Sequence, residues 1–282
     1  LDEKMRADTK PNDKPYKDGA CYTGKEHSWD EAFGYWGAAA HSLLLSAEQN
    51  YNIAKKKDLV SADYDEDGVV DLKSEYVFAH AYYASSFDKG GKTSYMEDIT
   101  RAFLDGRKLI TSANGEKLTD VQRTELMGHV SIISENWQKV IAESVFKYAG
   151  STYKSLVALE DVSNDDLAKE FGKYMKYWGE LKGFSMALQV GKDNIGESAT
   201  KLNRMIGFGP MLMDETQIIG IDSKGNYIMD KIYSMNDAKL HMLKIQKLMI
   251  DKFGVEAKSN DMLADMADLA SKIGTSESAE ND

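Results

Sequence analysis

Apolar residues recur at steps of three and four along most of the chain, which is the spacing of one face of an α-helix. The longest run follows Thr119 and Gln122, which stand in capping-box spacing, and it leads to Gly150, a residue type that often ends helices. We therefore predict a long helix over 119–150. Its apolar positions are Leu126, Val130, Ile133, Trp137, Ile141, Val145 and Tyr148.

Other segments repeat this pattern. A second long helix is predicted to open at Ser163, with Asp166 as its capping partner, and a last helix to end at Gly274. Their apolar positions are Leu167, Phe171, Tyr174, Trp178, Leu181 and Leu188 in the former, and Met262, Met266, Leu269 and Ile273 in the latter. Weaker helical patterns cover 29–57, 72–88, 93–111, 196–206 and 236–253. These segments predict an all-α fold of helical bundles, with at most a small hairpin over 217–232.

Both ends of the chain differ in composition from the middle. Residues 1–26 are polar and rich in turn-forming residues, which predicts an arm before the helices. Residues 275–282 are small and acidic, which predicts a tail. We assign 27–274 to a helical domain. A short internal similarity leaves two sub-bundles, 27–150 and 160–274, as the alternative to a single bundle.

Charge and cysteine usage narrow the classes of partner. The formal net charge is −11, and no basic stripe with interleaved aromatic residues accompanies it, which argues against a nucleic-acid partner. Such a surface suits cations, although solubility explains it equally well. Cys21 is the only cysteine, so an internal disulfide and a thiolate metal cluster are excluded. The longest apolar stretch, 38–47, is too short to span a bilayer.

The strongest chemical signal is an aspartate-rich loop at 63–75. Asp63, Asp65 and Asp67 stand at the first, third and fifth positions of a calcium-type loop, where alternate carboxylates direct their oxygens to one point. Gly68 follows them and permits the sharp turn that such a loop requires. This coincidence predicts a calcium site.

The rest of the loop supplies further candidate ligands. Val69 offers its carbonyl, and Asp71 stands where a ligand binds directly or through water. The twelfth position is Ser74, and the bidentate glutamate expected there is displaced by one place to Glu75. We therefore predict calcium ligation by the six residues Asp63, Asp65, Asp67, Val69, Asp71 and Glu75. The alternative is a solvated acidic turn that caps the following helix.

A second constellation combines imidazole and carboxylate. His27 and Asp30 are three residues apart and share a helix face, whereas Glu31 points elsewhere. Imidazole with carboxylate suits iron or zinc better than calcium. Two ligands make a weak site, so the others must come from distant segments, and His80 and Glu180 are the candidates. The alternative is that His27 and Asp30 only cap and pack a helix. Their spacing by itself favours this alternative over a metal site.

Four ordered motifs carry a resemblance to a known family. They are HSWDEAFGYWG at 27–37, DLKSEYVFAHA at 71–81, ENWQKVIAESVFKYA at 135–149 and YWGELKGFSMALQ at 177–189. Together they resemble the DUF4856 family of bacterial cell-envelope proteins, many of them lipoproteins, which have no assigned enzymatic activity. The spacing of His27 and Asp30 is also similar, more weakly, to the Gly-x-His-x-x-Glu motif of the imelysin family. Imelysin-like proteins are helical, have two bundles and are tied to iron uptake.

The resemblance implies a location and a role. It implies two imelysin-like four-helix bundles in the periplasm or at the surface of a Gram-negative bacterium, with a lipid anchor on a segment before Leu1. The implied function is an accessory role in the acquisition of iron or another divalent metal, with an envelope transport component as partner. One alternative is a structural or interaction protein whose calcium only stabilises the fold. Another is a zinc metallopeptidase with Glu31 as general base, which the lack of a second histidine at zinc-ligand spacing from His27 disfavours.

Overall fold

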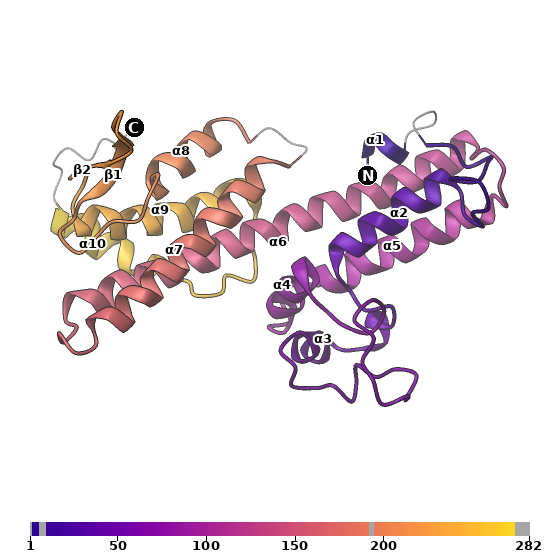
Figure 1. Ribbon diagram of the computed structural model, residues 1–282, viewed down its shortest axis with the longest axis horizontal. Helices are drawn as coiled ribbons and strands as arrows, with labels where there is room; N and C mark the ends of the chain where they lie inside the picture. Colours follow the sequence, from indigo (N-terminus) through magenta and orange to yellow (C-terminus); the bar gives the residue numbers. More distant parts are fainter. Residues whose placement is uncertain (1, 6–9, 192–194, 274–282) are drawn as a thin grey trace. The chain divides into compact units, whose positions relative to one another are not determined.

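The protein is mostly helical. A computed structural model describes residues 2–5, 10–191 and 195–273 (Figure 1). Helices make up 60% of the structure, and the described residues contain a single sheet of two strands. The predicted all-α fold with a small hairpin is therefore confirmed. None of the described helices has the length and apolar character needed to cross a membrane. The predicted tail at 275–282 lies outside the described residues.

The chain divides into two compact units. Unit 1 comprises Leu1–Val140 and unit 2 comprises Ile141–Asp282, so the division falls inside the long helix α6. Unit 1 contains α1 (Asp2–Met5), α2 (Gly24–Trp36), the short 3₁₀ helix η1 (Ser42–Leu44), α3 (Ala47–Ala54), α4 (Ala79–Asp88), α5 (Tyr95–Ser112) and the first part of α6 (Asp120–Glu160). Unit 2 contains the rest of α6, α7 (Leu167–Gln189), α8 (Glu197–Ile206), β1 (Gln217–Ile221), β2 (Tyr227–Asp230), α9 (Met235–Phe253), the 3₁₀ helix η2 (Leu263–Asp265) and α10 (Met266–Ile273).

Trp29 and Trp36 are the largest fully buried side chains in the core of unit 1. Trp29 is buried, and its indole nitrogen donates to the carbonyl of Phe103 on α5 (2.8 Å). Trp36 donates to the hydroxyl of Thr100 (3.1 Å) and packs edge-on against Trp137 of α6, with ring centroids 5.2 Å apart. Because the polar indole groups are satisfied inside the core, these side chains fix how α2, α5 and α6 pack.

Two of the weaker helix predictions are wrong in extent. The helix predicted over 29–57 ends at Gly37, whose φ of 82° is left-handed, and α3 starts only after Ser46. The helix predicted over 72–88 begins only at Ala79. The reason is tertiary: the amide of Phe78 donates to the carbonyl of Gly37 (2.9 Å), and the amide of Ala40 donates to the carbonyl of Ser74 (2.7 Å). Residues 74–78 therefore pair with the segment after α2 instead of with themselves.

Unit 2 confirms most predicted elements. The patterns at 196–206 and 236–253 form α8 and α9, and the hairpin forms with a bulge between Ile218 and Gly220. The helix predicted to open at Ser163 begins at Leu167, after a turn in which the Asp166 amide donates to the Ser163 hydroxyl (3.3 Å).

The predicted stop at Gly150 is wrong, because α6 continues to Glu160. A Cβ atom at this position would overlap the carbonyl oxygen of Asn260 and would lie 2.6 Å from the side-chain nitrogen of Gln246. That nitrogen in turn donates to the Asn260 carbonyl (2.8 Å). Gly150 is therefore a point where the 254–260 loop approaches the helix, and not a helix terminator.

His241 of α9 is a buried titratable group in unit 2. Its side chain is 3% exposed and packs edge-on against Tyr233, with ring centroids 4.8 Å apart. Burial lowers the pKa of His241 from 6.5 to about 4, with a smaller contribution in the same direction from Lys244. The imidazole is therefore neutral in the folded protein at neutral pH.

The close approach at Gly150 predicts a specific cost of substitution. Gly150→Ala should lower the free energy of unfolding by about 1–3 kcal/mol, because the loop backbone must move away from the new methyl group. Gly128→Ala, in the same helix but with nothing within 4 Å of its would-be Cβ, should instead raise it by about 0.4–1 kcal/mol. Urea denaturation of both variants tests this. A Gly150→Ala variant as stable as the wild type would contradict the packing described.

Burial of His241 predicts a pH dependence of stability. Because its folded-state pKa is depressed, the unfolded chain takes up a proton first as the pH falls below 6.5, and stability is lost between pH 6.5 and about 4. The loss attributable to this group is up to about 3 kcal/mol. His241→Phe should flatten the dependence in this window, whereas His129→Gln in α6 should leave it unchanged. Urea denaturation at a series of pH values measures both, and equal slopes in all three proteins would refute the assignment.

Candidate metal centre

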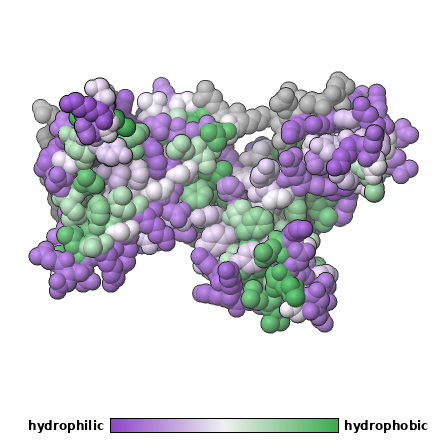
Figure 2. Space-filling view, in the orientation of Figure 1, coloured by the Kyte–Doolittle hydropathy of each residue, from purple (hydrophilic) through white to green (hydrophobic). Residues whose placement is uncertain are grey.

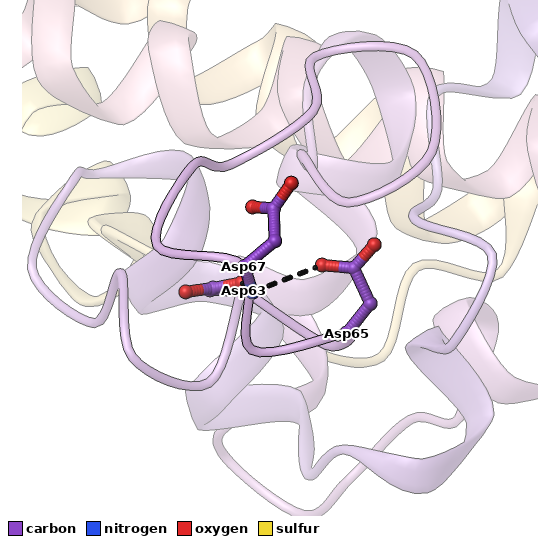
Figure 3. A group of neighbouring side chains, drawn as sticks. All are labelled: Asp63, Asp65 and Asp67. Atoms are coloured by element: carbon purple, nitrogen blue, oxygen red, sulfur yellow. Dashed lines mark hydrogen bonds between the residues drawn. The ribbon is translucent and has the colours of Figure 1, made fainter.

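Three aspartates converge on the loop between α3 and α4. Each of Asp63, Asp65 and Asp67 offers a carboxylate oxygen, and these oxygens all lie within 4.8 Å of one another (Figure 3). Asp63 is half-buried, and the other two are exposed. Calcium holds oxygen ligands at about 2.3–2.6 Å, so two oxygens on opposite sides of the ion lie about 5 Å apart. The spacing of the three carboxylates is therefore compatible with a common calcium ion.

The loop backbone holds the aspartates in this arrangement. The two oxygens of Asp63 accept hydrogen bonds from the amides of Asp67 (3.1 Å) and Gly68 (3.0 Å). Asp67 accepts from the amide of Val69 (2.8 Å). Gly68 has a φ of 86°, which lets the chain turn back over the carboxylates. These bonds explain the convergence, and a solvated acidic turn would form them as well.

Glu75 connects the two ends of the loop. One carboxylate oxygen accepts from the amides of Tyr64 (2.9 Å) and Asp65 (3.3 Å), and the other accepts from the amide of Asp71 (2.8 Å). The side chain is only 6% exposed, and the hydrogen bond from Asp71 leads the interactions that hold its pKa below the ordinary value. Glu75 therefore braces the loop as an ionised carboxylate.

Two other predicted ligands, Asp71 and Glu75, lie outside the group of three aspartates. The oxygens of Asp71 accept from the amide of Lys73 (2.9 Å) and the hydroxyl of Ser74 (3.0 Å). The Lys73 amide is the largest cause of the lowered pKa of Asp71. Calcium ligation by Asp71, Glu75 and the carbonyl of Val69 stays a prediction.

His41 packs behind the loop, a contact that sequence analysis misses. Its ring stacks on Tyr64 with centroids 4.8 Å apart, and its Nε2 lies 3.0 Å from the carbonyl oxygen of Ser61. A carbonyl accepts only, so we assign the proton to Nε2. His41 is 6% exposed and secures the loop to the segment after α2. No spacing rule connects it with Tyr64, which is 23 residues away along the chain.

The residues of the predicted second site have other partners. The Asp30 carboxylate pairs with the guanidinium of Arg107 (2.7 Å), which also pairs with Glu26 (2.7 Å). The His27 ring stacks on Tyr16 with centroids 3.9 Å apart. The structure thus uses this helix face to hold α2 to α5 through Arg107.

The two distant candidates, His80 and Glu180, lie in different units. In unit 1, His80 packs edge-on against Trp137 (5.3 Å between centroids), and burial lowers its pKa. In unit 2, Glu180 lines a shallow groove on α7 beside Gly179 and Gly183. Within the described ranges, neither these two residues nor His27 and Asp30 belong to a group of three ligand-type side chains in mutual reach.

Comparison with known proteins identifies no relative. No protein-family model, curated protein or solved structure matches this chain. The resemblance to the two envelope families stays a prediction. The function proposed below is therefore argued from the geometry of the chain itself.

The bracing by Glu75 predicts that its charge organises the loop. Glu75→Gln should remove the acceptor of at least one backbone hydrogen bond, since an amide group has one acceptor oxygen in place of two, and should weaken the others through loss of the charge. Hydrogen exchange of the Tyr64, Asp65 and Asp71 amides should accelerate about tenfold or more. Glu66→Gln, an exposed substitution in the same loop, is the matched control. Unaltered exchange at all three amides in the Glu75 variant would refute the brace.

Proposed function

We propose that the 63–75 loop binds a calcium ion that stabilises the fold of unit 1, in a protein that works outside the cytoplasm. The observation that carries the proposal is the convergence of Asp63, Asp65 and Asp67 within 4.8 Å, on a loop whose glycine stands where a calcium loop requires it. Three carboxylates at this spacing repel one another, and a divalent cation between them converts repulsion into attraction.

The ion would act on more than the loop. The loop joins α3 to α4, and its exit is hydrogen-bonded to the segment after α2 through Ser74 and Phe78. Ordering of the loop by calcium therefore favours the arrangement of three helices. An unfolded loop cannot hold the same oxygens together, so the binding free energy adds to the stability of the folded unit.

The expected affinity supports an extracytoplasmic location. Serine replaces the bidentate glutamate at the twelfth position, and calcium sites with fewer charged ligands bind weakly, in the range of about 10⁻⁴–10⁻³ M that is typical of extracellular modules. Such a site is filled where calcium is plentiful. The periplasm or cell surface, which the family resemblance implies, provides this condition.

A structural calcium ion is favoured over a transition-metal or peptidase centre. Asp30 would have to leave Arg107 before it could bind iron or zinc, and His80 is desolvated against Trp137. A zinc peptidase also needs an open coordination position and a positioned base. Nothing in the contacts of His27 and Asp30 favours that chemistry over helix packing.

The proposal predicts a calcium-dependent melting temperature. At ten times its dissociation constant, calcium should stabilise unit 1 by about 1.4 kcal/mol, or roughly 5 °C. The double variant Asp63→Asn, Asp67→Asn should lose this dependence, and Asp105→Asn, a half-buried aspartate of α5, should retain it. The readout is the difference between melting with calcium and after chelation, because removal of charge alone alters the calcium-free protein.

Two outcomes would overturn the proposal: a melting temperature unaffected by calcium in the wild type, or an equal calcium shift in the double variant. Elemental analysis of protein purified without chelator supplies an independent test. Stoichiometric iron or zinc in place of calcium would favour the predicted transition-metal site at His27 and Asp30 instead.

A further inference from the structure

A cationic cavity lies in unit 1, formed by the predicted N-terminal arm and the start of α6. Its volume is about 580 Å³. Among the described residues, the charged side chains that line it are Lys14, Lys25, Lys117, Arg123 and the acidic Asp13. Basic side chains thus gather here in a chain whose net charge is −11. Figure 2 shows the surface of this end of unit 1, where α6 begins in Figure 1, as mostly hydrophilic.

The walls of the cavity are held firmly. Asn12 is 3% exposed, and its amide donates to the carbonyls of Ile110 in α5 (3.3 Å) and of Glu116 in the turn after it (3.0 Å). Its carbonyl oxygen accepts from the hydroxyl of Thr23 (2.9 Å), the residue that caps α2. The described part of the arm is therefore packed against both helices, which preserves the cavity in the free protein.

The cations differ in how they are placed. Lys25 is only 2% exposed and donates to the carbonyl of Met5 (3.3 Å). Lys117 is 83% exposed at the side chain and lies 3.8 Å from Asp13, a distance that contributes little in water. Arg123 is 30% exposed and pairs with Asp120 and the carbonyl of Leu118. Lys25 and Arg123 also sit in the first turns of α2 and α6, which carry the acidic residues Glu26 and Asp120 as well.

We propose that this cavity binds a small polyanion, a molecule with phosphate or several carboxylate groups, through Lys14, Lys117 and Arg123. Guanidinium and ammonium groups form their strongest hydrogen bonds with such oxyanions. The cavity volume falls within the range of small-molecule sites, about 300–1,000 Å³. This site is separate from the calcium loop and does not depend on it.

Calorimetric titration with inorganic phosphate and with citrate tests the proposal and distinguishes the two chemistries. The protein is first passed over a chelating resin, so that citrate cannot act by removing calcium, and sodium chloride keeps the ionic strength constant. We expect saturable binding of at least one anion. Binding of phosphate alone identifies a phosphate-bearing ligand, and binding of citrate alone identifies a carboxylate-bearing one.

Variants locate the site. Arg123→Gln should weaken binding about tenfold, since a charge-assisted hydrogen bond is lost. Lys117→Gln should weaken it as well, and this exposed side chain can be changed without loss of the fold. Lys108→Gln is the matched control, because Lys108 lies on α5 in an exposed ion pair with Asp105 (3.4 Å). Absence of saturable binding of both anions, or equal weakening by the Lys108 and Lys117 variants, would overturn the proposal.

Discussion

Unit 1 depends on the backbone pairing between the segment after α2 and the segment before α4. The close approach of Gly37 to Phe78 leaves no room for a side chain, since a Cβ at Gly37 would lie 2.7 Å from the Phe78 carbonyl oxygen. The Gly37 carbonyl and the Phe78 amide bond to each other and are not available for helical hydrogen bonds. For this reason α2 ends before Gly37 and α4 begins only at Ala79. This pairing closes a segment that contains η1, α3 and the calcium-type loop, and Glu75 joins the two ends of that loop through the amides of Tyr64, Asp65 and Asp71.

Carboxylates that accept several backbone amides are the recurrent means of holding loops in this protein. Glu75 does so at the calcium-type loop, and Asp88 accepts from the amides of Tyr95 (3.0 Å) and Met96 (2.7 Å) at the start of α5. Glu143, fully buried in α6, accepts from Glu256 (2.5 Å), Ala257 (2.6 Å) and Lys258 (3.1 Å). Part of the acidic composition is therefore structural. A net charge of −11 does not by itself measure how much negative charge is available to ligands.

The predictions that succeed rest on interactions between residues close in sequence. The Thr119–Gln122 capping box forms as its spacing indicates, with the Gln122 amide donating to the Thr119 hydroxyl (3.3 Å). The hairpin and the convergence of the aspartates are likewise local, because turn geometry alone brings their atoms together. Predictions that combined distant segments had no such constraint. Nothing in the spacing of His27 and Asp30 shows that Arg107, far along the chain, occupies the carboxylate.

The sequence by itself determined the helical class, the positions of most helices and the aspartate cluster, since periodicity, caps and turn residues act within a few positions of one another. Only the tertiary structure decided what each special residue is for. The spacing of Gly150 predicts a helix end, yet this glycine permits the close approach of Asn260. The hydrogen bonds from backbone amides to Glu75 likewise have no signal in the sequence. His41 and the lysines around the cavity carry no local signal at all. The physical reason is common to these cases: a close approach or a shared hydrogen bond depends on which distant segment arrives, and that is decided by packing of the whole unit.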